Sequence, residues 1–132
     1  MIVIAVDCDG TIVRDKWPEI GRLRFLAKPV IKWLQKRGHE LVLSTCREGE
    51  YLYHAYFFLK AHGIEFKYYN ENTKERIAGY GHDCRKISAD LYLDDKAFFP
   101  GWIFVPAIVL WMEWRVKSAK RRSEVRHRER AL

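Results

Sequence analysis

Residues 3–12 read VIAVDCDGTI, a stretch that joins a continuous apolar run to two aspartates flanking a cysteine. A short run rich in β-branched residues, such as 2–6, is typical of a strand that is covered on both faces. Two carboxylates at the end of such a strand repel each other unless a cation or a shared proton offsets their charge. The stretch therefore predicts a buried strand that carries Asp7 and Asp9 at its carboxyl end, beside a positive group.

The chain beyond this stretch alternates between helix and strand signals. Pro29 stands in the first turn of one expected helix, and Gly38 follows where that helix would stop. We expect strands at 2–6, 40–45, 66–69 and 91–93, and helices at 28–37 and 48–62. Alternation of this kind is typical of a parallel sheet with helices on both sides. We therefore predict a three-layer α/β/α, Rossmann-like fold with a mainly parallel sheet.

The length and composition of the chain favour one domain. Its 132 residues are 48% hydrophobic, which suffices for a single core of ordinary size, so we expect one domain over 1–132. The net charge is +7, but residues 113–132 hold eight Lys or Arg and three Glu, so most of the excess lies at this end. We expect a basic C-terminal helix or tail at about 107–132. Its first half is expected to bury an apolar stripe formed by Ile108, Trp111, Met112, Val116 and Ala119.

Polar side chains follow three of the expected strands, and the carboxyl ends of parallel strands meet at one edge of the sheet. These side chains belong to Asp7, Asp9, Ser44, Thr45, Arg47, Asp94 and Asp95. Clustered carboxylates form the oxygen ligand set that Mg²⁺ prefers. A carboxylate beside Mg²⁺ can attack a phosphoryl group, and a second acid can protonate the leaving oxygen and later activate water. Thr45 and Lys86 offer a hydroxyl and a cation to the phosphoryl oxygens.

Four motifs occur in order along the chain: DCDGT at 7–11, LVLST at 41–45, KISAD beginning at Lys86, and the Asp94-Asp95 pair. This combination resembles the haloacid dehalogenase superfamily. The resemblance implies a Mg²⁺-dependent phosphatase, a phosphomonoester hydrolase that works through an aspartyl phosphate.

The resemblance also implies a role for each matching residue. Asp7 and Asp9 are expected to be catalytic, Asp7 as the nucleophile and Asp9 as the general acid and base. Thr45 and Lys86 would hold the phosphate. The expected metal ligands are Asp7, the backbone carbonyl of Asp9, and Asp94, with Asp95 acting through water or orienting its neighbour. Gly10 and Arg47, which adjoin these groups, are expected to contact the substrate. Lys74 is the alternative to Lys86 because Lys86 lies close to Asp94 in the sequence.

The chain is similar to the small members of this superfamily that have no cap domain. Its site is then expected to be open unless a partner subunit or the loop at 13–26, with Trp17-Pro18, covers it. The aromatic residues between Trp102 and Trp114 indicate a homo-oligomer interface. A small phosphorylated substrate is expected, and the basic tail offers a surface for nucleic acid or another polyanion.

Two alternatives to this chemistry are visible in the sequence. Cys8 and Arg14 have the C-x5-R spacing of cysteine phosphatases, but the flanking acids would repel the phosphate and raise the thiol pKa. A phosphate-binding regulatory or nucleic-acid-associated protein with little turnover would use the same pocket, although it would not need Asp9. Cys46 and Cys84 are expected to be packing residues.

The location of the protein is inferred from its cysteines and its apolar segments. Three cysteines without paired spacing are typical of a reducing compartment, so we expect a cytoplasmic protein. The apolar stretch at 102–112 contains Pro106 and is too short to span a bilayer. We therefore expect no membrane span.

Overall fold

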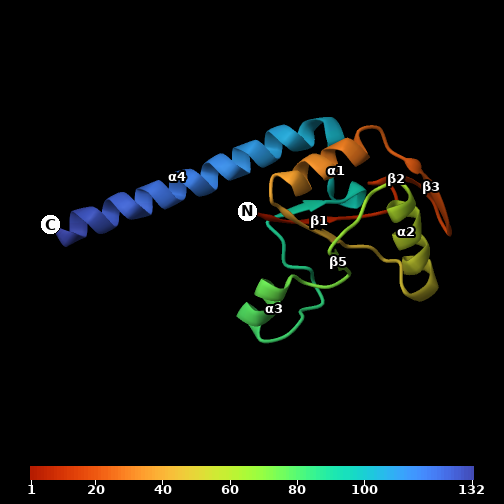
Figure 1. The fold of residues 1–132 in the computed structure, drawn as a ribbon, viewed down its shortest axis with the longest axis horizontal. Helices are drawn as coiled ribbons and strands as arrows, with labels where there is room; N and C mark the ends of the chain where they lie inside the picture. Colours follow the sequence, from red (N-terminus) through yellow and green to blue (C-terminus); the bar gives the residue numbers. More distant parts are fainter.

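The computed structural model describes the chain from Met1 to Leu132. At its centre is a parallel four-stranded sheet with the strand order β5-β4-β1-β6 (Figure 1). The strands are β1 (Val3–Val6), β4 (Glu40–Leu43), β5 (Tyr68–Tyr69) and β6 (Leu91–Leu93). The prediction of an α/β fold with a mainly parallel sheet is confirmed, with β4 and β5 shorter than expected.

The central strands end level with one another. Val6 of β1 pairs with Leu43 on one side and with Leu93 on the other. The N–H of Asp7 donates to the carbonyl of Leu93 at 2.9 Å, and the N–H of Ser44 donates to the carbonyl of Val6 at 2.8 Å. The residues that follow β1, β4 and β6 are thereby brought to one edge of the sheet.

One face of the sheet carries the larger apolar core. Ile4 and Val6 of β1 point to this face and share a cluster with buried residues of α1 (Ala27–Lys36), α2 (Gly49–Ala61) and α4 (Val105–Ala131). Successive strand residues alternate between faces, so Val3 and Ala5 point the other way. Both α1 and α2 lie within one residue of their predicted ends.

The other face of the sheet is covered by the segment between β5 and β6. Val3, Ala5 and Val42 form a smaller cluster there with Tyr68 and Ile87. This segment contains α3 (Lys74–Tyr80), which begins at a Thr73 side chain that accepts the N–H of Arg76. None of the α3 residues is buried. The sequence did not predict this helix, because a short helix without a buried face leaves no apolar periodicity.

The expected loop at 13–26 is instead a β-hairpin, formed by β2 (Val13–Lys16) and β3 (Glu19–Leu23). Lys16 pairs with Glu19, and the turn between the strands is Trp17-Pro18, joined by a cis peptide bond. Val13 is fully buried in the core, and Ile20 packs against it. The hairpin follows directly from the DCDGT motif and therefore stands beside the end of β1.

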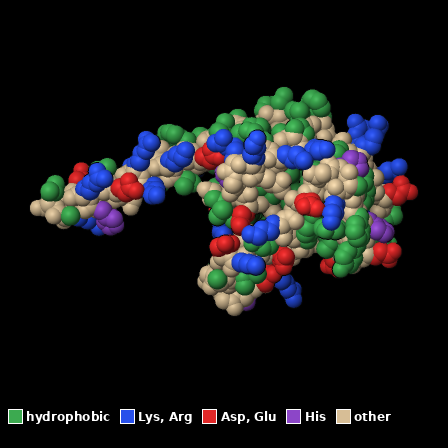
Figure 2. Space-filling model, viewed as in Figure 1, with side chains coloured by type: hydrophobic (Ala, Val, Ile, Leu, Met, Phe, Trp, Pro, Cys, Tyr) green, Lys and Arg blue, Asp and Glu red, His purple; other side chains and the backbone are tan.

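The C-terminal helix α4 runs without interruption from Val105 to Ala131 and extends far beyond the body of the protein (Figure 1). Two short 3₁₀ turns, η1 (Asp95–Ala97) and η2 (Trp102–Phe104), lead into it. Figure 2 shows basic side chains spread along the projecting part. The predicted helix is present. No helix of the chain combines the length and the apolar character that crossing a bilayer requires.

The predicted buried stripe of α4 is correct at Met112, which packs against the main core, and wrong at Trp111 and Val116. Val105 and Val109 are the buried residues of α4, whereas Trp111 and Val116 are each 54% exposed. Glu113 holds the first half of α4 against the body, because its carboxylate lies 2.6 Å from the Arg37 guanidinium and 2.7 Å from the His39 ring nitrogen. The helix leaves the body shortly after this contact, so apolar residues farther along have no surface to pack against.

Candidate active site

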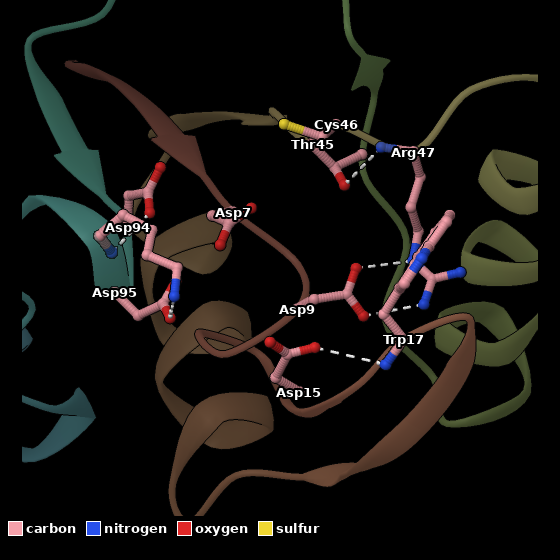
Figure 3. Close-up of a pocket in the computed structure, with 10 residues that line it drawn as sticks. Asp7, Asp9, Asp15, Trp17, Thr45, Cys46, Arg47, Asp94 and Asp95 are labelled. Atoms are coloured by element: carbon pink, nitrogen blue, oxygen red, sulfur yellow. Dashed lines mark hydrogen bonds and ion pairs between the residues drawn. The ribbon is translucent and has the colours of Figure 1, made fainter.

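A cleft of about 300 Å³ opens at the carboxyl edge of the sheet. Its walls come from the ends of β1, β4 and β6 and from the β2–β3 hairpin (Figure 3). The lining residues are Asp7, Asp9, Asp15, Trp17, Thr45, Cys46, Arg47, Asp94, Asp95 and Lys96. The cleft therefore gathers both acids of the DCDGT motif, the predicted threonine and the Asp94-Asp95 pair.

Three carboxylates meet at one end of the cleft. Oxygens of Asp7, Asp94 and Asp95 all lie within 4.8 Å of one another. Burial raises the pKa of Asp7 to about 7, with further increases from the charge of Asp94 and a hydrogen bond with Asp95. The cation beside these acids is Lys96, whose amino group lies 3.8 Å from Asp95 on an exposed side chain. The half-buried oxygens thus form a set that can hold a metal ion.

Thr11 and Gly10 fix this group, although only Gly10 was expected at the site. The fully buried hydroxyl of Thr11 donates to Asp7 at 3.2 Å and accepts the N–H of Asp95 at 2.9 Å. Gly10 has a φ of 86°, and a side-chain carbon there would overlap the Asp95 carboxylate. Gly10 therefore leaves room for the Asp95 carboxylate, and it does not line the cleft. The sequence contained the signal for Thr11 in the DCDGT motif.

Asp9 is directed away from the three carboxylates and toward Arg47 (Figure 3). Its two oxygens accept hydrogen bonds from Nε and Nη2 of Arg47 at 2.7 and 2.8 Å. This bidentate geometry is the strongest form of a carboxylate–guanidinium pair. The Arg47 side chain is only 1% exposed, whereas that of Asp9 is 18% exposed. Asp9 thus has a cation of its own and keeps one side open to the cleft.

Arg47 does not have the free donors that substrate binding would require. Besides the two bonds to Asp9, it donates to the carbonyls of Glu19 at 2.9 Å, Pro18 at 3.3 Å and Tyr51 at 3.5 Å. These contacts use all five N–H groups of the guanidinium. The expectation that Arg47 contacts the substrate is therefore corrected, because its N–H groups already bond Asp9 and three backbone carbonyls.

Thr45 lines the cleft in a loop that is held by Asn70. The N–H of Thr45 donates to Asn70 Oδ1 at 2.8 Å, and Asn70 Nδ2 donates to the carbonyl of Arg47 at 3.0 Å. The Thr45 hydroxyl accepts the N–H of Arg47 at 3.1 Å and can still donate toward the cleft. Cys46 is exposed at the cleft wall, so the expectation that it is a packing residue was wrong.

Neither lysine that was predicted to bind phosphate lines the cleft. Lys86 is exposed, and its amino group lies 5.3 Å from the ring centroid of Tyr92. The chain after it leads to Asp90, which accepts the N–H of Val3 at the amino end of β1, the edge opposite the cleft. Lys74 is exposed at the start of α3. The lysine that reaches the cleft is Lys96, which the sequence analysis did not single out.

Cys8 is unsuited to act as a nucleophile. Its side chain is fully buried in the main core, on the opposite side of the chain from its aspartate neighbours. Burial raises the pKa of the thiol to about 12, and the charge of Asp9 adds to this increase. The reactive form of a cysteine is the thiolate. The C-x5-R spacing with Arg14 is therefore coincidental.

Comparison with known proteins identifies one relative by structure. A solved conserved protein from Bacteroides thetaiotaomicron has 36% sequence identity and a TM-score of 0.75, over 84% of this chain and 91% of that chain. No family model matches the chain, and no curated protein matches it. The shared sequence and fold extend over nearly all of both chains. The chain therefore belongs to the same family as this conserved Bacteroides thetaiotaomicron protein.

Proposed function

We propose that the protein is a Mg²⁺-dependent phosphatase of the haloacid dehalogenase type that works through an aspartyl phosphate on Asp7. The observation that carries this proposal is the division of the acids into two settings. Asp7 lies with Asp94 and Asp95, within 4.8 Å of one another, whereas Asp9 is paired with a buried arginine. A nucleophile beside a metal and a separate proton-transfer group are the two parts that the reaction needs.

The chemistry proceeds in two displacements. An oxygen of Asp7 attacks phosphorus, and the bond from phosphorus to the leaving oxygen breaks. Asp9, which must enter this step in its protonated form, donates that proton to the leaving oxygen. Water then attacks the phosphorus of the aspartyl phosphate, Asp9 takes a proton from the water, and the bond to Asp7 breaks. Inorganic phosphate leaves, and both acids return to their starting states.

The metal site of this proposal consists of Asp7, Asp94 and Asp95. Their oxygen donors fit a hard divalent cation such as Mg²⁺, and the cation already beside them is the exposed Lys96. When bound, the ion would neutralise these acids and the charge of the phosphoryl oxygens. The backbone carbonyl of Asp9, at the same end of β1, is a further ligand that the family resemblance implies.

Thr45 and Lys96 are the proposed phosphate-binding groups. Thr45 retains a hydroxyl donor at the cleft wall. Lys96 has an 82% exposed side chain with its amino group 3.8 Å from Asp95, which leaves it free to turn toward a bound phosphate. Lys96 thus takes the role that the sequence analysis gave to Lys86.

The proposed architecture is a three-layer α/β/α domain without a cap, in which the β2–β3 hairpin is the element beside the cleft. The proposed substrate is a small phosphorylated molecule, because the cleft is only about 300 Å³. A reducing, cytoplasmic location is supported by the three unpaired cysteines. The exposed aromatic residues of α4 support a homo-oligomer, and its basic end supports contact with a polyanion such as nucleic acid.

A phosphate-release assay tests this function. Wild-type protein should hydrolyse p-nitrophenyl phosphate with Mg²⁺ and lose this activity in excess EDTA. Asp7→Asn should be inactive because an amide does not attack phosphorus. Asp83→Asn is the matched control, since Asp83 bonds Asn72 outside the cleft. Phosphate binding without turnover in the wild type would instead support a regulatory protein.

A further inference from the structure

The cleft continues past Asp9 to a second end, formed by Trp17 and Asp15 of the hairpin (Figure 3). We propose that this end binds the leaving group, and that the leaving group is an uncharged ring bearing hydroxyl groups, such as a monosaccharide. The inference rests on the proposed function, which places the phosphoryl group beside Asp7. The leaving oxygen must lie within reach of Asp9, so the rest of the substrate extends toward Trp17.

Trp17 is exposed, yet it is held in place. The residue is 54% exposed at the hairpin turn. The Arg47 guanidinium lies over the ring, 5.0 Å from its centroid, and the Tyr51 ring lies 4.8 Å away at an interplanar angle of 50°. Arg47 also bonds the carbonyls of Pro18 and Glu19 on the same turn. A rigid exposed aromatic side chain beside a cleft offers binding area at a small entropic cost.

The charges at this end select against an anionic leaving group. Arg47 is neutralised by Asp9, so it presents no net positive charge to the cleft. Asp15 adds a carboxylate; one of its oxygens accepts the N–H of Trp17 at 3.3 Å, and the other has no hydrogen-bond partner in the protein. That oxygen can accept a hydrogen bond from a substrate hydroxyl. A second phosphate or a carboxylate on the leaving group would be repelled.

The size of the cleft limits the substrate to a single ring. A volume of about 300 Å³ is at the lower end of the range for small-molecule sites. Part of that volume lies over the three carboxylates and would be filled by the metal ion and the phosphate. The remaining part extends toward Trp17, and the part of its ring that Arg47 and Tyr51 leave exposed has room for one sugar ring rather than a chain of them.

Comparison of three substrates tests this site. Glucose 6-phosphate has a neutral hydroxylated ring, methyl phosphate has no ring, and fructose 1,6-bisphosphate has an anionic leaving group. With Mg²⁺, the wild type should show the highest kcat/KM for glucose 6-phosphate. Trp17→Ala should lower the ratio of its kcat/KM to that of methyl phosphate by about tenfold, as expected for losing the apolar contact between the C–H face of the sugar and the indole. Trp17→Phe, which keeps a flat ring, should retain most of that ratio.

Two further variants complete the experiment. Tyr80→Ala removes an aromatic side chain of similar exposure, 55%, from α3 outside the cleft, and it should leave all three substrates unaffected. Asp15→Asn should raise the relative rate with fructose 1,6-bisphosphate. A glucose-to-methyl ratio that Trp17→Ala changes less than twofold would overturn the inference while leaving the phosphatase intact. Absence of Mg²⁺-dependent hydrolysis of all three substrates by the wild type would overturn the proposed function itself, and the inference with it.

Discussion

Replacing Arg47 by methionine should destabilise the protein strongly, because Arg47 connects Asp9 to the β2–β3 hairpin. The substitution keeps an unbranched apolar stem and removes the guanidinium. It leaves the Asp9 carboxylate without its cation and the carbonyls of Pro18 and Glu19 without their donor. Removing one partner of a buried ion pair costs about 3–5 kcal/mol of unfolding free energy. Asp9 remains 18% exposed and can gain some hydration, so we expect a loss near 3 kcal/mol, at the lower limit of that range.

Urea denaturation followed by circular dichroism measures this loss. Lys16→Met is the matched control, because Lys16 pairs with Glu19 on the same hairpin but its side chain is 67% exposed. Exposed ion pairs contribute little, so the control should retain nearly the wild-type midpoint. Asp9→Asn combined with Arg47→Met should cost less than the sum of the two single changes, because the unpaired charge is gone. An Arg47→Met loss below about 1 kcal/mol would refute the interpretation of Arg47 as a buried link.

Three further predictions concern the metal, the docking of α4 and its exposed surface. The affinity for Mg²⁺ should rise with pH up to about 7, because the proton on Asp7 competes with the ion. Calorimetry at a series of fixed pH values would contradict this if the affinity did not rise. Hydrogen bonding by Arg37 lowers the pKa of Glu113 from 4.5 to about 2, so the stability that Glu113 supplies is complete above about 4.5 and lost as pH falls toward 2. The stability difference between wild type and Glu113→Gln should therefore shrink as pH falls over that interval. A difference independent of pH would count against this role of Glu113. Light scattering should find an oligomer that Trp111→Glu dissociates and that deletion of 117–132 leaves intact, whereas a monomeric wild type would remove the interface.

The sequence predicted the mainly parallel sheet and the edge at which the acids gather. The apolar runs of β1 and β4 are continuous, because these strands are buried on both faces. Since parallel strands end at a common edge, the positions of Asp7, Thr45 and Asp94 along the chain sufficed to place them in one cleft. Local pattern and global topology agree at these positions, which is the condition under which sequence inference works.

Other features depend on contacts that no local pattern carries. The hairpin sequence is mostly polar, and only Val13, Ile20 and Leu23 reach the core, so its alternation was not recognised. The pairing of Arg47 with Asp9 joins residues far apart in the chain, and nothing beside either residue signals the other. Lys86 was assigned from motif order, but its backbone lies before the start of β6 and its side chain remains outside the cleft.

The covalent intermediate on Asp7 is the most direct test of the proposed function. Wild-type protein would be mixed with Mg²⁺ and a phosphomonoester, quenched in acid during turnover, and reduced with borohydride, which converts an aspartyl phosphate to homoserine. Mass spectrometry of the N-terminal peptide should then find homoserine at position 7 in the wild type, and none in Asp7→Asn or in samples without Mg²⁺. Rapid Mg²⁺-dependent phosphate release by Asp7→Asn, or a modified residue at a position other than 7, would contradict the account.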